Sequence, residues 1–154
     1  MGKMKLDEKD IEILKELERD GRKSLKSISK NLKLSMTSVF ERIKKLERNG
    51  VIKGYKAVID KGKLEKSSTA FALVKLDPSS GGKVKEIAKK VSGISGVSEV
   101  FIVNGQWDMV VKLRARDMDE IAKIVLDKLR TVEGIGNVET VHSWETIKES
   151  FDVF

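Results

Sequence analysis

The sequence contains no cysteine, one proline and few aromatic residues, which make up 5% of its 154 positions. The lack of cysteine excludes disulfides, thiolate metal ligands and cysteine nucleophiles, and it is typical of a reducing compartment. No apolar run approaches the roughly 18 residues of a membrane span. The polar, acidic start "MGKMKLDEKD" is unlike a signal peptide. We therefore expect a cytoplasmic protein with no membrane partner.

Histidine is almost absent as well, since His142 is the only one in the chain. A zinc site or a histidine-based catalytic site needs further ligands or partners, and the sequence offers neither a second histidine nor a thiol. A lone histidine on a strand more often has a structural role. We predict no metal site, no cofactor and no catalytic residue, and hence a protein that is not an enzyme.

Charge, in contrast, is abundant and unevenly placed. Charged residues make up 36% of the chain, and the net charge is +7. Residues 22–66 hold 14 Lys and Arg against 4 Asp and Glu, whereas residues 67–154 hold 12 against 13. A solvated surface is the simplest explanation of a charge-rich stretch, but so segregated an excess indicates a polyanionic partner, with nucleic acid first. The charge density and the lack of cysteine also favour a thermophilic origin.

Three amphipathic segments fill the first part of the chain. The apolar spacing predicts helices over 7–20, 25–31 and 35–48, with Asp7, Ser24 and Ser35 able to cap their N-termini. The stretch "VIKGYKAVID", residues 51–60, alternates enough to predict a strand. Three short helices, the last two joined by a tight turn, followed by a strand indicate a winged helix-turn-helix. We predict a DNA-binding domain over 1–60 and a polar linker over 61–68.

The outward face of the third helix carries the candidate contacts to double-stranded DNA. Short polar and basic groups near its N-terminus are typical of a recognition helix that meets base edges, and basic groups farther along suit phosphates. Arg42 is our main candidate for a base or phosphate contact, and a solvated helix face is the alternative. The predicted DNA-binding residues are Ser35, Met36, Thr37, Ser38, Glu41, Arg42, Lys45 and Arg48.

The second part of the chain repeats itself. "EIAKKV" at 86–91 returns as "EIAKIV" at 120–125, and "GISGVSEV" at 93–100 returns as "GIGNVETV" at 134–141. A β-prone segment precedes each helical segment, so the order is β-α-β-β-α-β. This predicts an α+β protein whose second domain, residues 69–154, is ferredoxin-like. Two helices cover one face of such a sheet, and its other, apolar face indicates a homodimer.

Four stretches taken together resemble one known family. They are "LDEKDIEILKELERDGR", "RIKKLERNGVIKGY", "NGQWD" and "GIGNVET". They resemble motifs of the Lrp/AsnC (feast/famine) regulators, and the resemblance covers roughly residues 6–147. It implies a DNA-binding domain followed by an effector-binding and oligomerisation domain. It further implies dimers that join into tetramers or octamers, and small effectors, usually amino acids, that bind near the "NGQWD" loop.

The resemblance also implies which residues hold the effector. Gly105 would let a ligand approach the backbone, Trp107 would wall the pocket, and Asp108 would pair with an α-ammonium group. Alternatively, Asp108 accepts backbone N–H groups at the shoulder of an Asn-Gly hairpin, and Trp107 packs between subunits. Asn104 and Val138 stand where the family usually has threonine. The implied effector residues are Asn104, Gly105, Trp107, Asp108, Gly134, Thr140 and His142.

These observations favour a sequence-specific transcriptional regulator whose assembly or DNA binding responds to an amino acid. One alternative is a DNA architectural protein that ignores small molecules. Another is an enzyme resembling siroheme decarboxylase, which has a similar fold. The basic excess at 22–66 and the outward face of the third helix argue against the enzyme.

Overall fold

The computed structural model describes residues 5–60, 63, 68–149 and 153–154. The chain forms two compact units that divide between Val58 and Ile59, and the described residues Val153 and Phe154 group with the first unit. The linker predicted over 61–68 lies mostly outside the described residues, although its last residue, Ser68, begins a strand. Among the described residues, no helix combines the length and apolar character needed to cross a membrane.

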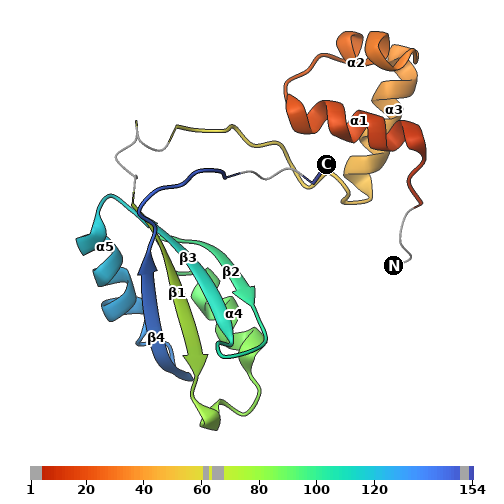
Figure 1. Ribbon diagram of the computed structural model, residues 1–154. Coiled ribbons are helices and arrows are strands. Elements are labelled where there is room, and N and C mark those ends of the chain that lie inside the picture. Colours follow the sequence, from red (N-terminus) through yellow and green to blue (C-terminus); the bar gives the residue numbers. More distant parts are fainter. Residues whose placement is uncertain (1–4, 61–62, 64–67, 150–152) are drawn as a thin grey trace. The chain divides into compact units, whose positions relative to one another are not determined.

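The first unit is a bundle of three helices, drawn in red to orange in Figure 1. Helix α1 spans Glu8–Arg19, α2 spans Leu25–Leu32 and α3 spans Met36–Arg48. Each begins at the predicted N-cap. The side chains of Asp7, Ser24 and Ser35 each accept a backbone N–H from the residue three positions later, which satisfies one of the free donors of the first turn.

One apolar cluster holds these helices together. Its fully buried members come from all three helices, and Ile52 packs against it from the segment after α3. The apolar spacing that predicted the three helices thus reflects one shared core, although Leu25, the first residue of α2, is exposed. The buried residues are Ile13, Ile28, Val39, Ile43 and Leu46.

The strand predicted over 51–60 is wrong for this chain. These residues form no strand, and Val58 is 96% exposed. A strand needs a neighbour for its N–H and C=O groups. In the part of the chain that the structure describes, no strand pairs with this segment. Alternation of residue types therefore shows only that a segment is compatible with a strand. The strand forms only where a neighbouring strand is available to pair with it.

The second unit has the predicted β-α-β-β-α-β order. Its strands are β1 (Ser68–Leu76), β2 (Val97–Ile102), β3 (Met109–Ala115) and β4 (Ile135–His142). Its helices are η2 (Pro78–Ser80), α4 (Val84–Ser92), α5 (Met118–Lys123) and the π-helical continuation η3 (Ile124–Leu129). The antiparallel sheet has the order β2-β3-β1-β4, which is the ferredoxin-like arrangement.

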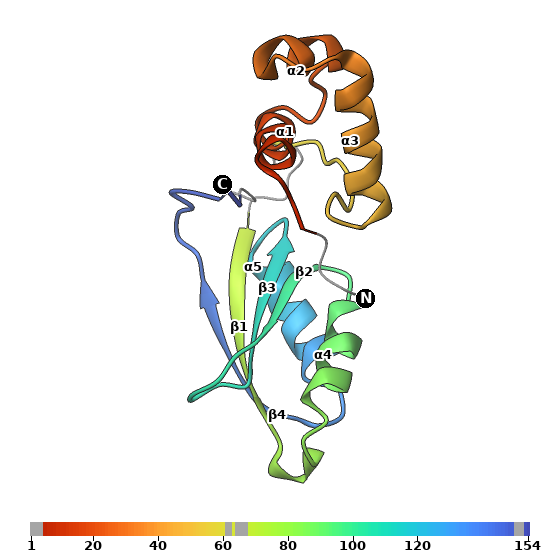
Figure 2. The same cartoon turned by 90° about the vertical axis from the view of Figure 1, so that its right-hand side faces the viewer.

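Helices α4 and α5 cover one face of this sheet, as Figures 1 and 2 show. The register explains the core: Ala72 of β1 lies opposite Val111 of β3, and both are buried beneath the helices. The strand register places Phe71, Phe101 and Val141 on the other face, which none of the described helices of this unit covers, and Phe101 is half exposed. The open face predicted from the repeat is therefore present.

Candidate DNA-binding and effector sites

Helix α3 presents most of the predicted DNA-binding residues to solvent. Met36, Thr37, Glu41, Lys45 and Arg48 are exposed, and Ser38 is half-buried. An open depression of about 340 Å³ follows this face. It is lined by Asp7, Ser38, Glu41, Arg42, Lys45 and Arg48.

Two of the predicted residues on α3 already have local hydrogen bonds. The Ser35 hydroxyl caps the helix by accepting the N–H of Ser38 at 3.0 Å. Arg48 Nε donates to the carbonyl of Lys44 at 3.3 Å. Within the residues that the structure describes, no hydrogen bond or ion pair engages the Lys45 ammonium group. Lys45 is therefore the cation of this face that is most available to a phosphate.

Arg42 lies differently from the prediction that it points away from the core. Its side chain is 28% exposed, and its Nη1 atom donates to Asp7 Oδ2 at 2.7 Å and to Asp10 Oδ1 at 2.5 Å. These hydrogen bonds hold the pKa of Asp7 below its usual value and raise that of Arg42. The prediction treated Arg42 as a free surface cation, because the neighbouring sequence does not indicate partners that are 32 and 35 residues away.

The connection between β2 and β3 is longer than a two-residue Asn-Gly turn. Strand β2 ends at Ile102 and β3 begins at Met109, and the Val103 N–H closes the loop by donating to the Asp108 carbonyl at 3.0 Å. Asn104 and Gly105 form its exposed tip, and Trp107 is half-buried. Gly105 has φ +122°, and a Cβ there would meet no atom within 4 Å. The glycine serves the backbone conformation and leaves open space beside it.

Asp108 fastens this loop to the end of β1. Its Oδ2 accepts the Leu76 N–H at 2.8 Å, its own N–H donates to the Val74 carbonyl at 2.9 Å, and Lys75 Nζ lies 3.4 Å from Oδ1. The Leu76 hydrogen bond is the main cause of a lowered pKa for Asp108. The β1–β4 register shifts between Lys75 and Leu76, so the carboxylate satisfies a strand N–H at an irregular point. Asp108 thus accepts a backbone N–H group next to the β2–β3 connection, as the alternative to an effector role expected.

The remaining predicted effector residues fall into two groups. Gly134 lies at the same end of the sheet as Asp108, since its carbonyl accepts the Asp77 N–H at 2.9 Å. Thr140 and His142 lie farther along β4, opposite Ala72 and Ala70. His142 is eight residues beyond Gly134 on an extended strand, which corresponds to about 25 Å. Within one chain, the "NGQWD" loop and Gly134 therefore lie at the same end of the sheet, whereas His142 lies toward the opposite end.

The backbone conformation at Gly134 favours glycine, and a side chain there would also press on the flexible end of Ile87. Gly134 has φ +91°, and a Cβ at this position would lie 2.6 Å from Ile87 Cδ1 of α4. Backbone conformation and packing therefore explain why glycine stands at position 134, without reference to an effector. A separate depression of about 400 Å³ in this unit lies near Gly96, Arg116 and Glu120, where β3 ends and α5 begins.

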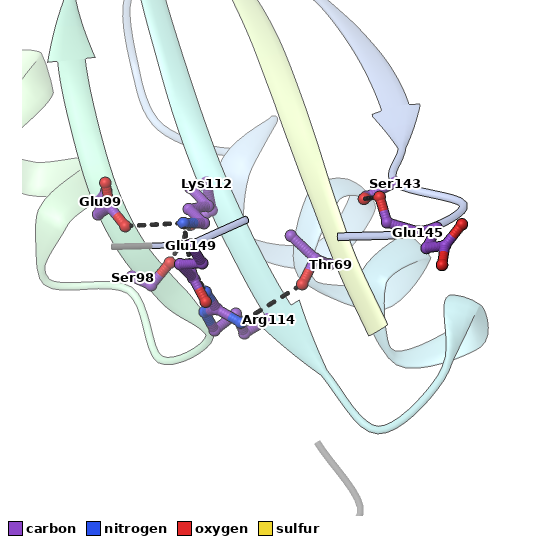
Figure 3. A network of polar contacts seen from close by, with 8 residues as sticks. All are labelled: Thr69, Ser98, Glu99, Lys112, Arg114, Ser143, Glu145 and Glu149. Carbon is purple, nitrogen blue, oxygen red and sulfur yellow. Dashed lines mark hydrogen bonds and ion pairs between the residues drawn. The ribbon is translucent and has the colours of Figure 1, made fainter. Parts of the chain in front are cut away.

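The open face of the sheet also carries an ionic network that sequence reasoning missed (Figure 3). Lys112 Nζ lies 3.0 Å from Glu99 Oε1, and Glu149 pairs with both Lys112 and Arg114. Arg114 also donates to the Thr69 hydroxyl at 3.4 Å. The signal was present in β3, where Lys112 and Arg114 alternate with buried residues. Glu149 gave no signal, because it joins the network only through the path of the chain after β4.

Comparison with known proteins agrees with this architecture. Residues 6–53 match the model of a winged helix-turn-helix DNA-binding domain. Residues 69–153 match the model of the Lrp/AsnC ligand-binding domain. The fold and the two matches define a protein with a DNA-binding unit and a ligand-binding unit.

Relatives of nearly the same length support this assignment. An uncharacterized HTH-type transcriptional regulator of Pyrococcus furiosus is 41% identical, over 94% of this chain and 96% of its own. The HTH-type transcriptional regulator FL11 of Pyrococcus horikoshii is 36% identical, over 96% and 95%. A Neisseria meningitidis transcriptional regulator, solved in complex with L-Met, has a TM-score of 0.86 at 26% identity, over 96% and 95%. The chain belongs to the Lrp/AsnC family of transcriptional regulators.

Proposed function

We propose that this regulator binds double-stranded DNA through α3 and responds to an amino acid bound near Asp108. The exposed residues of α3 named above, with Lys45 the most available cation, support the DNA contact. We propose Thr37, Ser38 and Met36 for base edges and Lys45 and Arg48 for phosphates. Its relatives are named as regulators, and we propose no catalytic activity.

The carboxylate of Asp108 is the observation that carries the effector proposal. One of its oxygens accepts the Leu76 N–H, whereas the other, among the residues that the structure describes, has only the long contact to Lys75, whose side chain is 46% exposed. An incoming α-ammonium group can compete for that second oxygen. Gly105, with open space beside it, and the half-buried Trp107 belong to the same loop as this carboxylate. The L-Met complex of the Neisseria regulator supports an amino acid as the ligand.

Thr140 and His142 belong to this proposal only if a second chain contributes. Neither reaches the Asp108 end of the sheet within one chain. The apolar open face supports a homodimer, and pairing of dimers into a tetramer or octamer would bring several loops together. We therefore propose that the complete effector site forms between chains.

The deciding experiment is a thermal-shift screen of the full-length protein against the twenty amino acids. A ligand that binds only the folded state raises the melting temperature according to its concentration and Kd. Asp108→Asn retains an oxygen that can accept the Leu76 N–H but removes the charge, so it should fold and lose the response. Glu133→Gln, an exposed acid beside Gly134, is the control and should keep it.

Two results would contradict the effector proposal. If no amino acid stabilises the wild type, the regulator works without such an effector, as the architectural alternative requires. If Asp108→Asn responds like the wild type, the ligand binds elsewhere in the protein.

A further inference from the structure

The contact between Arg42 and helix α1 is built from the helix cap itself. Asp7 Oδ1 accepts the Asp10 N–H at 2.8 Å, and Asp10 Oδ2 accepts the Asp7 N–H at 3.2 Å, which together form a capping box. The other oxygen of each carboxylate accepts a hydrogen bond from Arg42 Nη1. Both carboxylates thus divide their oxygens between capping α1 and holding α3.

Burial makes this contact difficult to give up. The Asp10 residue is 1% exposed, and Arg42 is the only cation paired with it among the described residues. If the guanidinium left for a phosphate, a buried carboxylate would lose its counter-charge, which is strongly unfavourable. A single nitrogen, Nη1, serves both acids, so a small displacement of Arg42 disturbs both hydrogen bonds together.

The hydrogen bonds of Arg42 also lie where they can fix the orientation of α3, the proposed recognition helix. Val39, Ile43 and Leu46 pack α3 onto the bundle through apolar contacts, which are non-directional and allow small rotations. Arg42 lies on the flank of that stripe and next to the exposed Glu41, so directional hydrogen bonds there fix the rotation of α3. Rotation decides which side chains reach base edges.

We propose that Arg42 is a positioning residue for DNA recognition: the Asp7–Asp10–Arg42 cluster sets the rotation of α3, and Arg42 does not itself read DNA. This replaces the prediction of a direct base or phosphate contact. It rests on DNA binding through α3 and is independent of the effector. The two roles differ most clearly in what they require of Asp10, because this residue is 1% exposed and offers DNA no accessible surface of its own.

The test measures binding of the full-length protein to two duplexes. One is recovered by in vitro selection with the wild type, and the other is a shuffled sequence of the same length. Arg42→Gln, Asp10→Asn and the double variant are compared over a range of salt. We expect each single variant to lose about tenfold in specific affinity, the size of one mismatched base pair, with little change on shuffled DNA. The double variant should lose no more than the worse single variant.

Salt dependence separates positioning from phosphate contact. Losing one phosphate contact lowers the slope of log K against log salt by about 0.9, so Lys45→Gln should lower it and Arg42→Gln should not. Glu8→Gln removes an acid of the same helical turn that does not pair with Arg42 among the described residues, and it should bind like the wild type. Circular dichroism melts confirm that each variant is folded at the assay temperature.

Asp7→Asn covers the case in which a variant of the buried pair fails to fold. Asparagine is an equally good N-cap, so this variant keeps the helix and removes only the exposed carboxylate. We expect it to lose part of the specific affinity. The proposal is overturned if Arg42→Gln lowers the salt slope, or if the variants of Asp7 and Asp10 bind the selected duplex as tightly as the wild type or tighter.

Discussion

The Asp108 carboxylate accepts the backbone N–H of Leu76 at 2.8 Å, across 32 positions of sequence. This hydrogen bond joins the start of β3 to the end of β1, where the register of the sheet shifts. The residue proposed to bind the effector is therefore also a support of the sheet. Variants of Asp108 have to be interpreted with both roles in mind.

Replacing Asp108 should separate these roles. Asp108→Ala leaves the partly buried Leu76 N–H without its acceptor, and we expect a loss of about 1–3 kcal/mol in the free energy of unfolding. Asp108→Asn keeps an acceptor and should lose less. Urea denaturation of the effector-free protein measures both. Equal losses would mean that the charge, rather than the hydrogen bond, supports the sheet.

Stability should fall on the acid side. The Leu76 N–H lowers the pKa of Asp108, Arg42 lowers that of Asp7, and Lys23 lowers that of Glu16. A carboxyl with a lower pKa in the folded state stabilises above its unfolded pKa, and this contribution disappears as the pH falls through the folded value. Melting temperatures should hold near neutrality and drop once the pH falls below the ordinary values, 3.8 for Asp and 4.5 for Glu.

A variant tests whether the loss of stability at low pH comes from the carboxyl groups named above. Asp108→Asn should show a shallower decline between pH 5 and pH 2, about one ionisation less, whereas Glu133→Gln should follow the wild type. Identical profiles for Asp108→Asn and the wild type would place the acid sensitivity in other carboxyls.

Gly134→Ala should destabilise the second unit. The added Cβ meets both an unfavourable positive φ and the Ile87 side chain at 2.6 Å, and we expect a loss of about 1–3 kcal/mol. Gly105→Ala has a positive φ but no crowding, so its loss should be smaller. Ile87→Val removes the Cδ1 atom, and in combination with Gly134→Ala it should cost less than the sum of the two. Strict additivity in denaturant melts would exclude the contact as the cause.

The open face of the sheet should hold the dimer together. Phe101 lies on that face opposite Val110 and is 50% exposed, so Phe101→Lys would place a charge in the interface. We expect a lower mass by size-exclusion chromatography with light scattering. Leu126→Lys changes a similarly exposed residue of η3, on the helix side, and should leave the dimer intact. A wild-type mass for Phe101→Lys would assign the dimer to another surface.

The sequence by itself determined the local elements and their order. Polar residues at Asp7, Ser24 and Ser35 start the helices because their side chains accept the free N–H groups of the first turn. The β-prone segment expected before the second repeated helix is β3, whose side chains alternate in burial because those of a strand point to two faces in turn. The internal repeat then predicted the β-α-β-β-α-β order, since each unit can bury its apolar face only against the other.

Only the tertiary structure decided what the polar side chains bind. Arg42 and Asp10 are 32 positions apart, as are Asp108 and Leu76, and neither pairing leaves a periodic trace in the sequence. The segment 51–60 illustrates the same limit, because its residue types alternate but none of the described strands pairs with it. Propensity and periodicity act through neighbours in the chain, whereas a hydrogen bond or an ion pair depends on where the fold brings two distant groups together.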